Sequence, residues 1–247
     1  MIRADVRRAF SSFGFWATMA GICIAGLLLG LENIATANLM QMNSLWPQHM
    51  MAMMLTITSD VFILLIPVLS TFAFSSAFIE EYSAGFTKYS LMRASKNDYS
   101  ASKTLAVIAS GGLPVLIGLV ILILVFYISV PTIYNTGENY SEQYYMFFIE
   151  LVTLAVNGAL WSVVGSLSAT ITKNRYIAFA FPFVFFYVLS VFQTRYYPDL
   201  LLLNPTEIMR TLVYIGSVEI GLIVSLIALG ILAFIHYLCI RNKLKNV

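Results

Sequence analysis

The sequence predicts an all-α protein with six membrane-spanning helices. Hydrophobic residues make up 60% of the 247-residue chain and charged residues only 11%, whereas a soluble domain carries about 25% charged residues. The hydrophobic residues fall into six blocks, each near the roughly 20 residues that an α-helix needs to cross the hydrocarbon core. Lys and Arg gather in alternate connections between these blocks. We therefore expect one polytopic membrane domain over 1–247.

Helices are the expected structure of all six blocks because a backbone in lipid must satisfy its own hydrogen bonds. Strands of a membrane barrel would be about half as long and would alternate polar and apolar residues. Pro67, Pro114 and Pro182 lie inside blocks, where neighbouring helices tolerate a kink. The predicted spans are 13–31, 57–78, 104–130, 146–171, 177–192 and 218–240.

The distribution of basic residues predicts the orientation. Of the 14 Lys and Arg residues, 12 lie on the side that holds both termini, and Arg195 and Arg210 lie on the other. Because cytoplasmic connections carry the excess of Lys and Arg, we expect both termini in the cytoplasm. Adding or removing one span would destroy this sorting, so the same count supports six spans.

The segment before the first span has the pattern of an interfacial helix. Ile2, Val6, Ala9 and Phe10 share one helical face and arginines occupy the rest. The alternative is a frayed basic tail. A signal peptide is a competing interpretation because Ala35-Thr36-Ala37 resembles a cleavage site. The apolar block is long for a signal peptide, so we expect a retained helix.

The motifs of common enzymes are missing from the sequence. It contains no G-x-x-x-x-G-K-[ST] phosphate loop, no H-E-x-x-H and no G-x-S-x-G. The pair Glu80-Glu81 resembles that of intramembrane glutamate proteases, but those follow the pair with an arginine one turn later, where this chain has 82–85, Tyr-Ser-Ala-Gly. We expect no catalytic residues, and an intramembrane hydrolase remains the least favoured alternative.

The connection 80–103 is the most informative segment. Apolar and aromatic residues alternate there with basic ones, which suits a short helix that docks apolar side chains on a partner while its charges stay in water. A helix lying on lipid headgroups would have the same composition. The apolar residues are Phe86, Tyr89, Leu91 and Met92, and the basic ones are Lys88, Arg93 and Lys96.

This connection resembles the corresponding loop of the type-2 permeases of ABC transporters. Those permeases carry a Glu at the end of span two, a Gly four residues on, a short amphipathic helix, and a Lys that opens span three. Glu81, Gly85, 86–95 and Lys103 occupy these positions here. The six-span layout, the basic interfacial helix and an Asn-Pro turn before span six (204–205) are similar as well. The chain departs from the family at two positions: Tyr82 stands where a basic residue is usual, and Arg93 where a proline is common.

The resemblance implies the membrane subunit of an ABC exporter in the plasma membrane of a bacterium. A separate ATP-binding subunit would bind ATP and Mg²⁺, so this chain needs no cofactor. A second permease chain, identical or different, would complete a dimer, and no nucleic-acid partner is expected. A motor-free channel or scaffold is the alternative. The residues that would couple to the ATPase are Glu81, Gly85, Phe86, Lys88, Tyr89, Leu91 and Met92.

Small residues predict close helix packing in the first span. Gly26 and Gly30 form a G-x-x-x-G motif, and Gly165 with Ala169 forms a similar pair in the fourth span. Such pairs let helix backbones approach closely. We expect Gly26 and Gly30 to serve packing, within the chain or across a dimer, and not to bind a ligand.

Three carboxylates are candidates for a cargo pathway. Asp60, Glu150 and Glu219 lie near the outer ends of spans two, four and six. Membrane-depth carboxylates normally face a cavity or a partner, so these residues predict an acidic outer vestibule for a cationic cargo such as an amphipathic peptide. The alternative is that they extend to the outer interface.

Metal and disulfide chemistry are not predicted. The outer segment 32–56 is rich in methionine and contains His49, a set of soft ligands that suits copper(I). Its spacing fixes no coordination geometry, and methionine is also an adaptable apolar filler, which we favour. Cys23 and Cys239 both lie inside apolar blocks and are expected to be free. The methionines are Met40, Met42, Met50, Met51, Met53 and Met54.

Overall fold

The computed structural model describes residues 2–40, 47–130, 140–210 and 218–246, and these ranges are helical without any β-strand. The helices are α1 (Ile2–Phe10), α2 (Phe13–Met40), α3 (Gln48–Ile57), α4 (Asp60–Leu69), α5 (Ala77–Ser83), α6 (Phe86–Leu91), α7 (Lys96–Ser129), α8 (Ser141–Thr172), α9 (Ile177–Tyr196), η2 (Leu201–Leu203), α10 (Pro205–Ile208), α12 (Val218–Lys243) and η3 (Leu244–Asn246). This confirms the all-α prediction for the described ranges.

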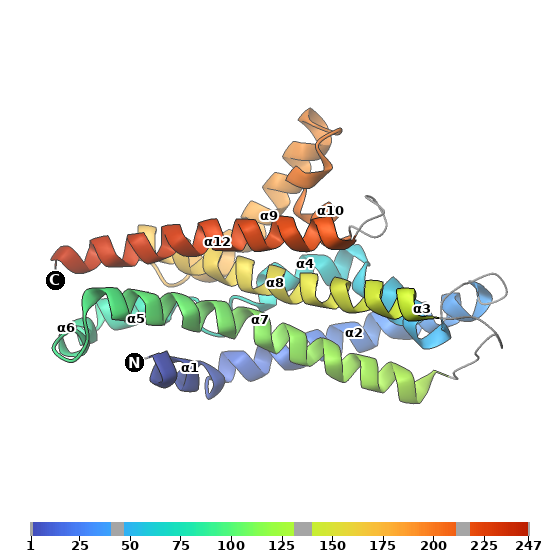
Figure 1. The fold of residues 1–247 in the computed structure, drawn as a ribbon, viewed down its shortest axis with the longest axis horizontal. Coiled ribbons are helices and arrows are strands. Elements are labelled where there is room, and N and C mark those ends of the chain that lie inside the picture. Colours follow the sequence, from blue (N-terminus) through green and yellow to red (C-terminus); the bar gives the residue numbers. More distant parts are fainter. Residues whose placement is uncertain (1, 41–46, 131–139, 211–217, 247) are drawn as a thin grey trace.

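The long helices form an elongated bundle (Figure 1). Helices α2, α7, α8 and α12 run along its long axis, whereas α9 leans away from it. Both chain ends lie at one end of the bundle together with α6. In the described ranges, five helices are long and apolar enough to cross a membrane, namely α2, α7, α8, α9 and α12. A sixth span is present if the bent pair of α3 and α4 is counted as one.

The second predicted span, 57–78, is not a continuous helix. Helix α3 ends at Ile57, α4 begins at Asp60, and the two are bent by 62°. The break has a local cause, because Ser59 is a favoured N-cap residue and its hydroxyl accepts a hydrogen bond from the Phe62 amide. Helix α4 has 10 residues, about 15 Å of helix, half the thickness of a hydrocarbon core. Turns over 70–76 then separate it from α5.

Helix α8 is the central helix of the bundle. Its apolar window is 78% buried, against 17–39% for the other four long helices, and it packs on α7, α9 and α12. Polar side chains tie it to its neighbours: Asn157 Nδ2 donates to Ser225 Oγ of α12 at 2.9 Å, and Ser166 lies 2.9 Å from His236 Nε2. Such bonds contribute about 0.6–2 kcal/mol each between membrane helices. They fix α8 as the element around which the others are arranged.

The G-x-x-x-G motif of α2 lies against α7 of the same chain. A Cβ added at Gly26 would overlap the Leu122 side chain, and one added at Gly30 would overlap the Phe126 ring. The two glycines therefore allow the close approach of α2 to α7. Gly165 is similarly close to the Ala178 carbonyl of α9.

The outer connections are more helical than the sequence suggested. Helix α2 continues to Met40, α3 begins at Gln48, and α8 begins at Ser141, five residues before the predicted span 146–171. After α9, the chain forms η2 and the short α10, where the Asn204 side chain accepts from the Thr206 amide. Three parts of the predicted connections, 41–46 with Met42, 131–139 and 211–217, lie outside the described residues.

Candidate functional site

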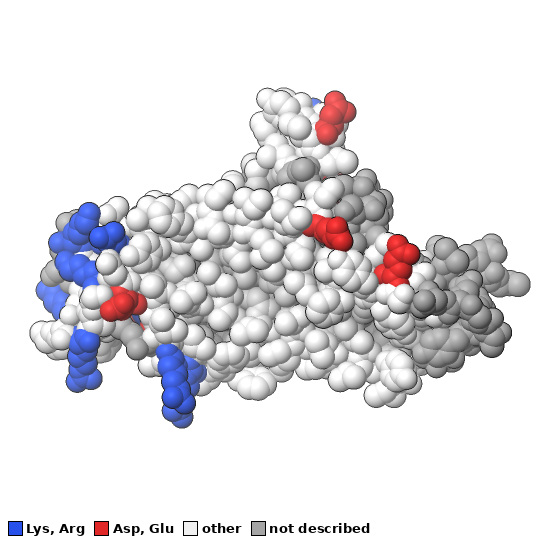
Figure 2. Space-filling model, in the orientation of Figure 1, with Lys and Arg blue, Asp and Glu red and all other residues white. Residues whose placement is uncertain are grey.

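The candidate site lies at the end of the bundle that holds both chain termini. Helices α1, α5 and α6 and the first turns of α7 meet there (Figure 1). Most of the Lys and Arg side chains visible in Figure 2 gather over the same end. The basic residues that the sequence assigns to one side of the membrane are therefore also together in the folded chain.

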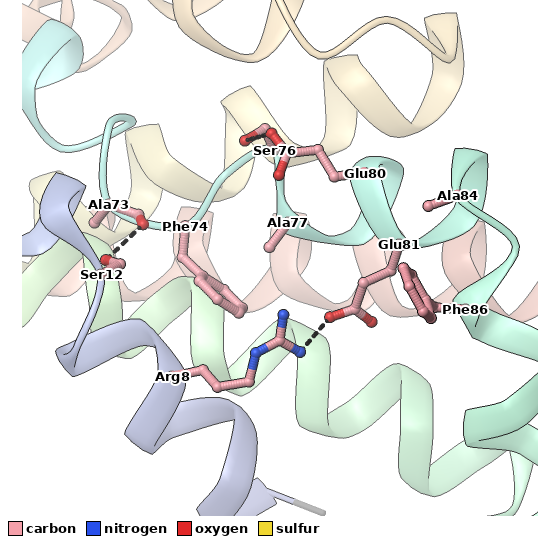
Figure 3. A pocket seen from close by; sticks show the side chains of 10 residues that line it. All are labelled: Arg8, Ser12, Ala73, Phe74, Ser76, Ala77, Glu80, Glu81, Ala84 and Phe86. Atoms are coloured by element: carbon pink, nitrogen blue, oxygen red, sulfur yellow. Dashed lines mark hydrogen bonds and ion pairs between the residues drawn. The ribbon is translucent and has the colours of Figure 1, made fainter.

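A cluster of four charged residues joins three elements of this end. Lys103 of α7 donates to Asp5 Oδ1 of α1 at 2.8 Å and to Glu81 Oε1 of α5 at 2.7 Å. Arg8 of α1 donates to the same Glu81 oxygen at 2.6 Å (Figure 3). Two carboxylates and two cations compensate each other. We call Asp5, Arg8, Glu81 and Lys103 the inner ion cluster.

Two neutral side chains complete the hydrogen bonding of the inner ion cluster. Tyr99 donates its hydroxyl to Glu81 Oε2 at 2.8 Å, and Ser102 donates to Asp5 Oδ2 at 2.5 Å. The side chain of Lys103 is 1% exposed, and its ammonium also lies 5.6 Å from the centre of the Phe74 ring. A buried charge of this kind is tolerated only when it is paired and hydrogen-bonded, so the cluster holds α1, α5 and α7 in one arrangement.

Local sequence explains why α7 presents these groups together. Ser95 caps the helix, its hydroxyl accepting from the Asp98 amide at 3.1 Å. With the helix starting at Lys96, Tyr99 and Lys103 are four residues apart and share a face. On α1, Asp5 and Arg8 are three residues apart, and Arg8 Nη1 lies 3.9 Å from Asp5 Oδ1.

Helix α6 has an anchored side and an exposed apolar side. It follows Gly85, whose φ of 75° lies in the left-handed region that glycine adopts without strain. Thr87 is buried, and Leu91 packs against the buried cluster of Phe78 and Tyr99. On the other side, the side chains are open to solvent: Phe86, Tyr89 and Met92 are 60%, 68% and 80% exposed.

The exposed side of α6 continues into the inner ion cluster through two neighbouring grooves. The first has a volume of about 430 Å³ and is shown in Figure 3, where Arg8 reaches toward Glu81 beside Phe86. The second has a volume of about 520 Å³ and runs from Arg8 and Glu81 along Tyr89. A partner segment bound in the second groove would contact both the apolar face of α6 and two residues of the inner ion cluster, Arg8 and Glu81.

Three of the predicted coupling residues, Glu81, Gly85 and Leu91, do not belong to the exposed face. Leu91 was expected to dock on a partner, but it is half-buried and faces inward. The reason is helical geometry: two residues correspond to about 200°, so Leu91 points away from Tyr89. Lys88 is exposed, and Glu81 and Gly85 lie behind the face rather than on it.

The sequence did not predict three residues that form or contact the inner ion cluster. The interfacial pattern of segment 2–10 does not predict the ion pairs of Asp5 and Arg8, and no sequence pattern marks Tyr99. A signal did exist, because a Lys at the start of an apolar block needs a partner at membrane depth. The sequence does not say which carboxylate supplies it.

The glutamate pair does not act as one unit. Glu81 belongs to the inner ion cluster, whereas Glu80 Oε1 accepts from Ser76 at 2.9 Å and turns to the opposite side (Figure 3). Both glutamates line the first groove, and Glu80 also lines a further groove that it shares with Lys173 and Arg175. The two carboxylates therefore differ in their hydrogen-bond partners.

The three outer carboxylates have different surroundings. Asp60 forms an ion pair with Arg210 at 2.6 Å, and Glu219 accepts from the Tyr145 hydroxyl at 2.9 Å. Glu150 is 0% exposed, so it does not extend to the interface. Near Asp60, burial raises the pKa of Glu207, and the neighbouring Arg210 opposes this rise.

No metal centre is found among the described residues. They contain no group of three His, Cys, Asp or Glu side chains able to hold an ion. His49 packs edge-on against Tyr127, and Met50 and Met53 are buried in the main core. Both cysteines are free. The methionines of segment 32–56 whose side chains are described, Met50, Met51, Met53 and Met54, thus pack in or against the core.

The described helices define a class: a helical, multi-pass membrane protein with most of its basic residues at one end. No protein-family model and no curated protein matches this chain.

Proposed function

We propose that this chain is the membrane subunit of an ATP-driven ABC exporter and that α6 docks on a separate ATPase. The supporting observation is the exposed apolar face of Phe86, Tyr89 and Met92 on a helix whose other side is anchored. Large exposed aromatic side chains beside basic residues are typical of protein interfaces. The chain lacks a phosphate loop of its own, which fits a motor on a partner.

The inner ion cluster offers a physical route from α6 to the membrane helices. Movement of α6 is passed to α5 through the short turn at Gly85, and Glu81 of α5 is bonded to both α1 and α7. Closure of the ATPase would displace α6, and the cluster would carry this displacement into α7. Hydrolysis would reset it.

The proposed topology has six spans, with the bent pair of α3 and α4 as the second, and both termini in the cytoplasm of a bacterium. It is supported by the gathering of Lys and Arg around both chain ends (Figure 2) and by the positive-inside rule. The chain would work as a dimer of permeases with two ATPases.

The proposed cargo is a hydrophobic or amphipathic molecule, with a cationic peptide as the leading example. The outer connections and span ends are acidic and carry only Arg195 and Arg210 as basic residues, a field that favours cations. Asp60, Glu150 and Glu219 remain candidates for the pathway, although Asp60 is paired with Arg210.

The decisive experiment measures binding between this chain in nanodiscs and a phosphate-loop ATPase encoded by a neighbouring gene. Phe86→Glu and Tyr89→Glu should each weaken binding by about 2 kcal/mol or more, roughly 25-fold, because aromatic anchors dominate such interfaces. Tyr176→Glu is the matched control: an aromatic residue 64% exposed in the connection between α8 and α9.

Two outcomes would contradict the proposal. If the α6 variants bind and stimulate the ATPase normally, α6 is a helix on the lipid surface. If no such ATPase is encoded nearby or co-purifies from native membranes, a channel or scaffold becomes the better interpretation.

A further inference from the structure

A fully buried carboxylate lies in the outer half of the bundle, far from the inner ion cluster. Glu150 belongs to α8 and is 0% exposed. Neither of its oxygens has a hydrogen-bond partner among the described residues. Glu150 and Thr172 are 22 positions apart on α8, a rise of about 33 Å, so the basic end of the molecule is out of reach.

No cation of the described ranges forms an ion pair with Glu150. The basic residues of the outer side are Arg195 and Arg210, and Arg210 is paired with Asp60. The segments 41–46, 131–139 and 211–217 contain no Lys, Arg or His. His49, the histidine of this half, packs on Tyr127.

The elements packed against α8 bring few titratable groups to this half of the bundle. They are Tyr127 from α7, Glu219 from α12, Asp60 from α4, and Tyr187, Arg195 and Tyr196 from α9. None of these described side chains forms a hydrogen bond or an ion pair with Glu150. Glu219 and Asp60 carry the same charge as an ionised Glu150 and would repel it.

We propose that Glu150 is a proton-binding site in the outer half of the bundle, occupied in the conformation described here. An ionised carboxylate without a cation or a hydrogen-bond donor is strongly disfavoured in a low-dielectric interior, whereas the neutral acid is tolerated. The bound proton is what allows α8 to pack closely around this residue. When the outer half opens and water reaches Glu150, the proton leaves and the carboxylate becomes a site for a cation. The inference rests on burial and charge, and holds whether or not the chain is a transporter.

Infrared spectroscopy of the full chain in lipid at neutral pH tests the proposal directly. Glu150→Gln keeps the shape of the protonated acid and should remove a carbonyl band of a carboxylic acid that the unchanged protein shows. Glu142→Gln is the matched control, since Glu142 is exposed in the first turn of the same helix. That change should remove a carboxylate band instead. Loss of a carboxylate band in Glu150→Gln would overturn the proposal.

A chemical test on the unchanged protein covers the case in which Glu150→Gln does not fold. A hydrophobic carbodiimide takes the proton of a carboxylic acid on one nitrogen, the carboxyl oxygen adds to its carbon, and rearrangement gives a stable N-acylurea. Peptide mass spectrometry should find this adduct on Glu150, with labelling that declines as pH rises. A water-soluble carbodiimide should modify Glu142 and spare Glu150. Labelling of Glu142 alone by both reagents, together with a spectrum lacking the acid band, would refute the assignment.

Discussion

The two ends of the bundle bury carboxylates in opposite ways. At the inner end, Asp5 and Glu81 are neutralised by Lys103 and Arg8, which come from different elements. In the outer half, Glu150 is buried more completely and has no partner in the described ranges. Compensated charges hold several elements in one arrangement, because moving any one of them leaves another buried charge without its partner, which is energetically costly. A carboxylate without a partner holds nothing in place, and its environment can change when its proton leaves.

The largest effect is expected from breaking the inner ion cluster. Lys103→Met would leave Asp5 and Glu81 with Arg8 alone, and removing one member of a buried ion pair costs about 3–5 kcal/mol. Denaturant titration of the protein in mixed micelles measures this loss. Lys96→Met is the control, because Lys96 is exposed at the start of the same helix and should change stability by less than about 0.5 kcal/mol.

A double variant sharpens the same comparison. Glu81→Gln combined with Lys103→Met removes one charge of each sign, so the pair should be less destabilising than Lys103→Met alone. If the double variant is less stable than Lys103→Met, Lys103 does not neutralise Asp5 and Glu81, and the charge pairing of the inner ion cluster is refuted.

Helix packing between the two ends gives the next largest effect. Gly30→Leu would drive a side chain into the Phe126 ring, and overpacking of this kind costs about 1–3 kcal/mol. Adding Phe126→Ala should recover part of the loss. Gly230→Ala is the matched control, since a Cβ at Gly230 meets nothing within 4 Å. Equal effects at Gly30 and Gly230 would mean that α2 does not approach α7 closely.

The long helices were predictable from the sequence because hydropathy over about 20 residues reports burial in lipid without knowledge of contacts. The expected spans 104–130 and 177–192 differ from α7 and α9 mainly at their ends. The predicted span 57–78 instead comprises α4, turns over 70–76 and α5, and the bend before it is set by one capping side chain, Ser59, which a hydropathy count does not weigh.

The candidate site was predictable only in part. Exposure of Phe86, Tyr89 and Met92 follows from amphipathic spacing within one short helix. The bonds of Glu81 to Arg8 and Lys103 join residues 73 and 22 positions apart, and only the tertiary fold determines which of the available charges meet. The burial of Glu150 also depends on the packing of several helices around α8.

A smaller effect is expected at the turn between the inner ion cluster and α6. Gly85→Ala places a side chain in the left-handed region, which costs about 1 kcal/mol, although a Cβ there would meet no neighbour. Stimulation of a bound ATPase should fall more than the free energy of unfolding, because the turn sets the direction of α6. Gly85→Asn should be milder, since asparagine tolerates this conformation. A variant with normal coupling and a strongly lowered stability would show that the turn serves folding alone.

Labelling of single cysteines decides which end of the comparison faces the cytoplasm, with no expected cost in stability. In a background of Cys23→Ala and Cys239→Ala, Ser141→Cys at the start of α8 should react with an impermeant maleimide from outside intact cells. Asn97→Cys in the first turn of α7 should react only after the membrane is permeabilised. Both positions are exposed, so a difference in labelling reports sidedness and not burial. Labelling of position 97 from outside would place α6 where no ATP-driven partner could reach it, and the proposed coupling would fail with the orientation.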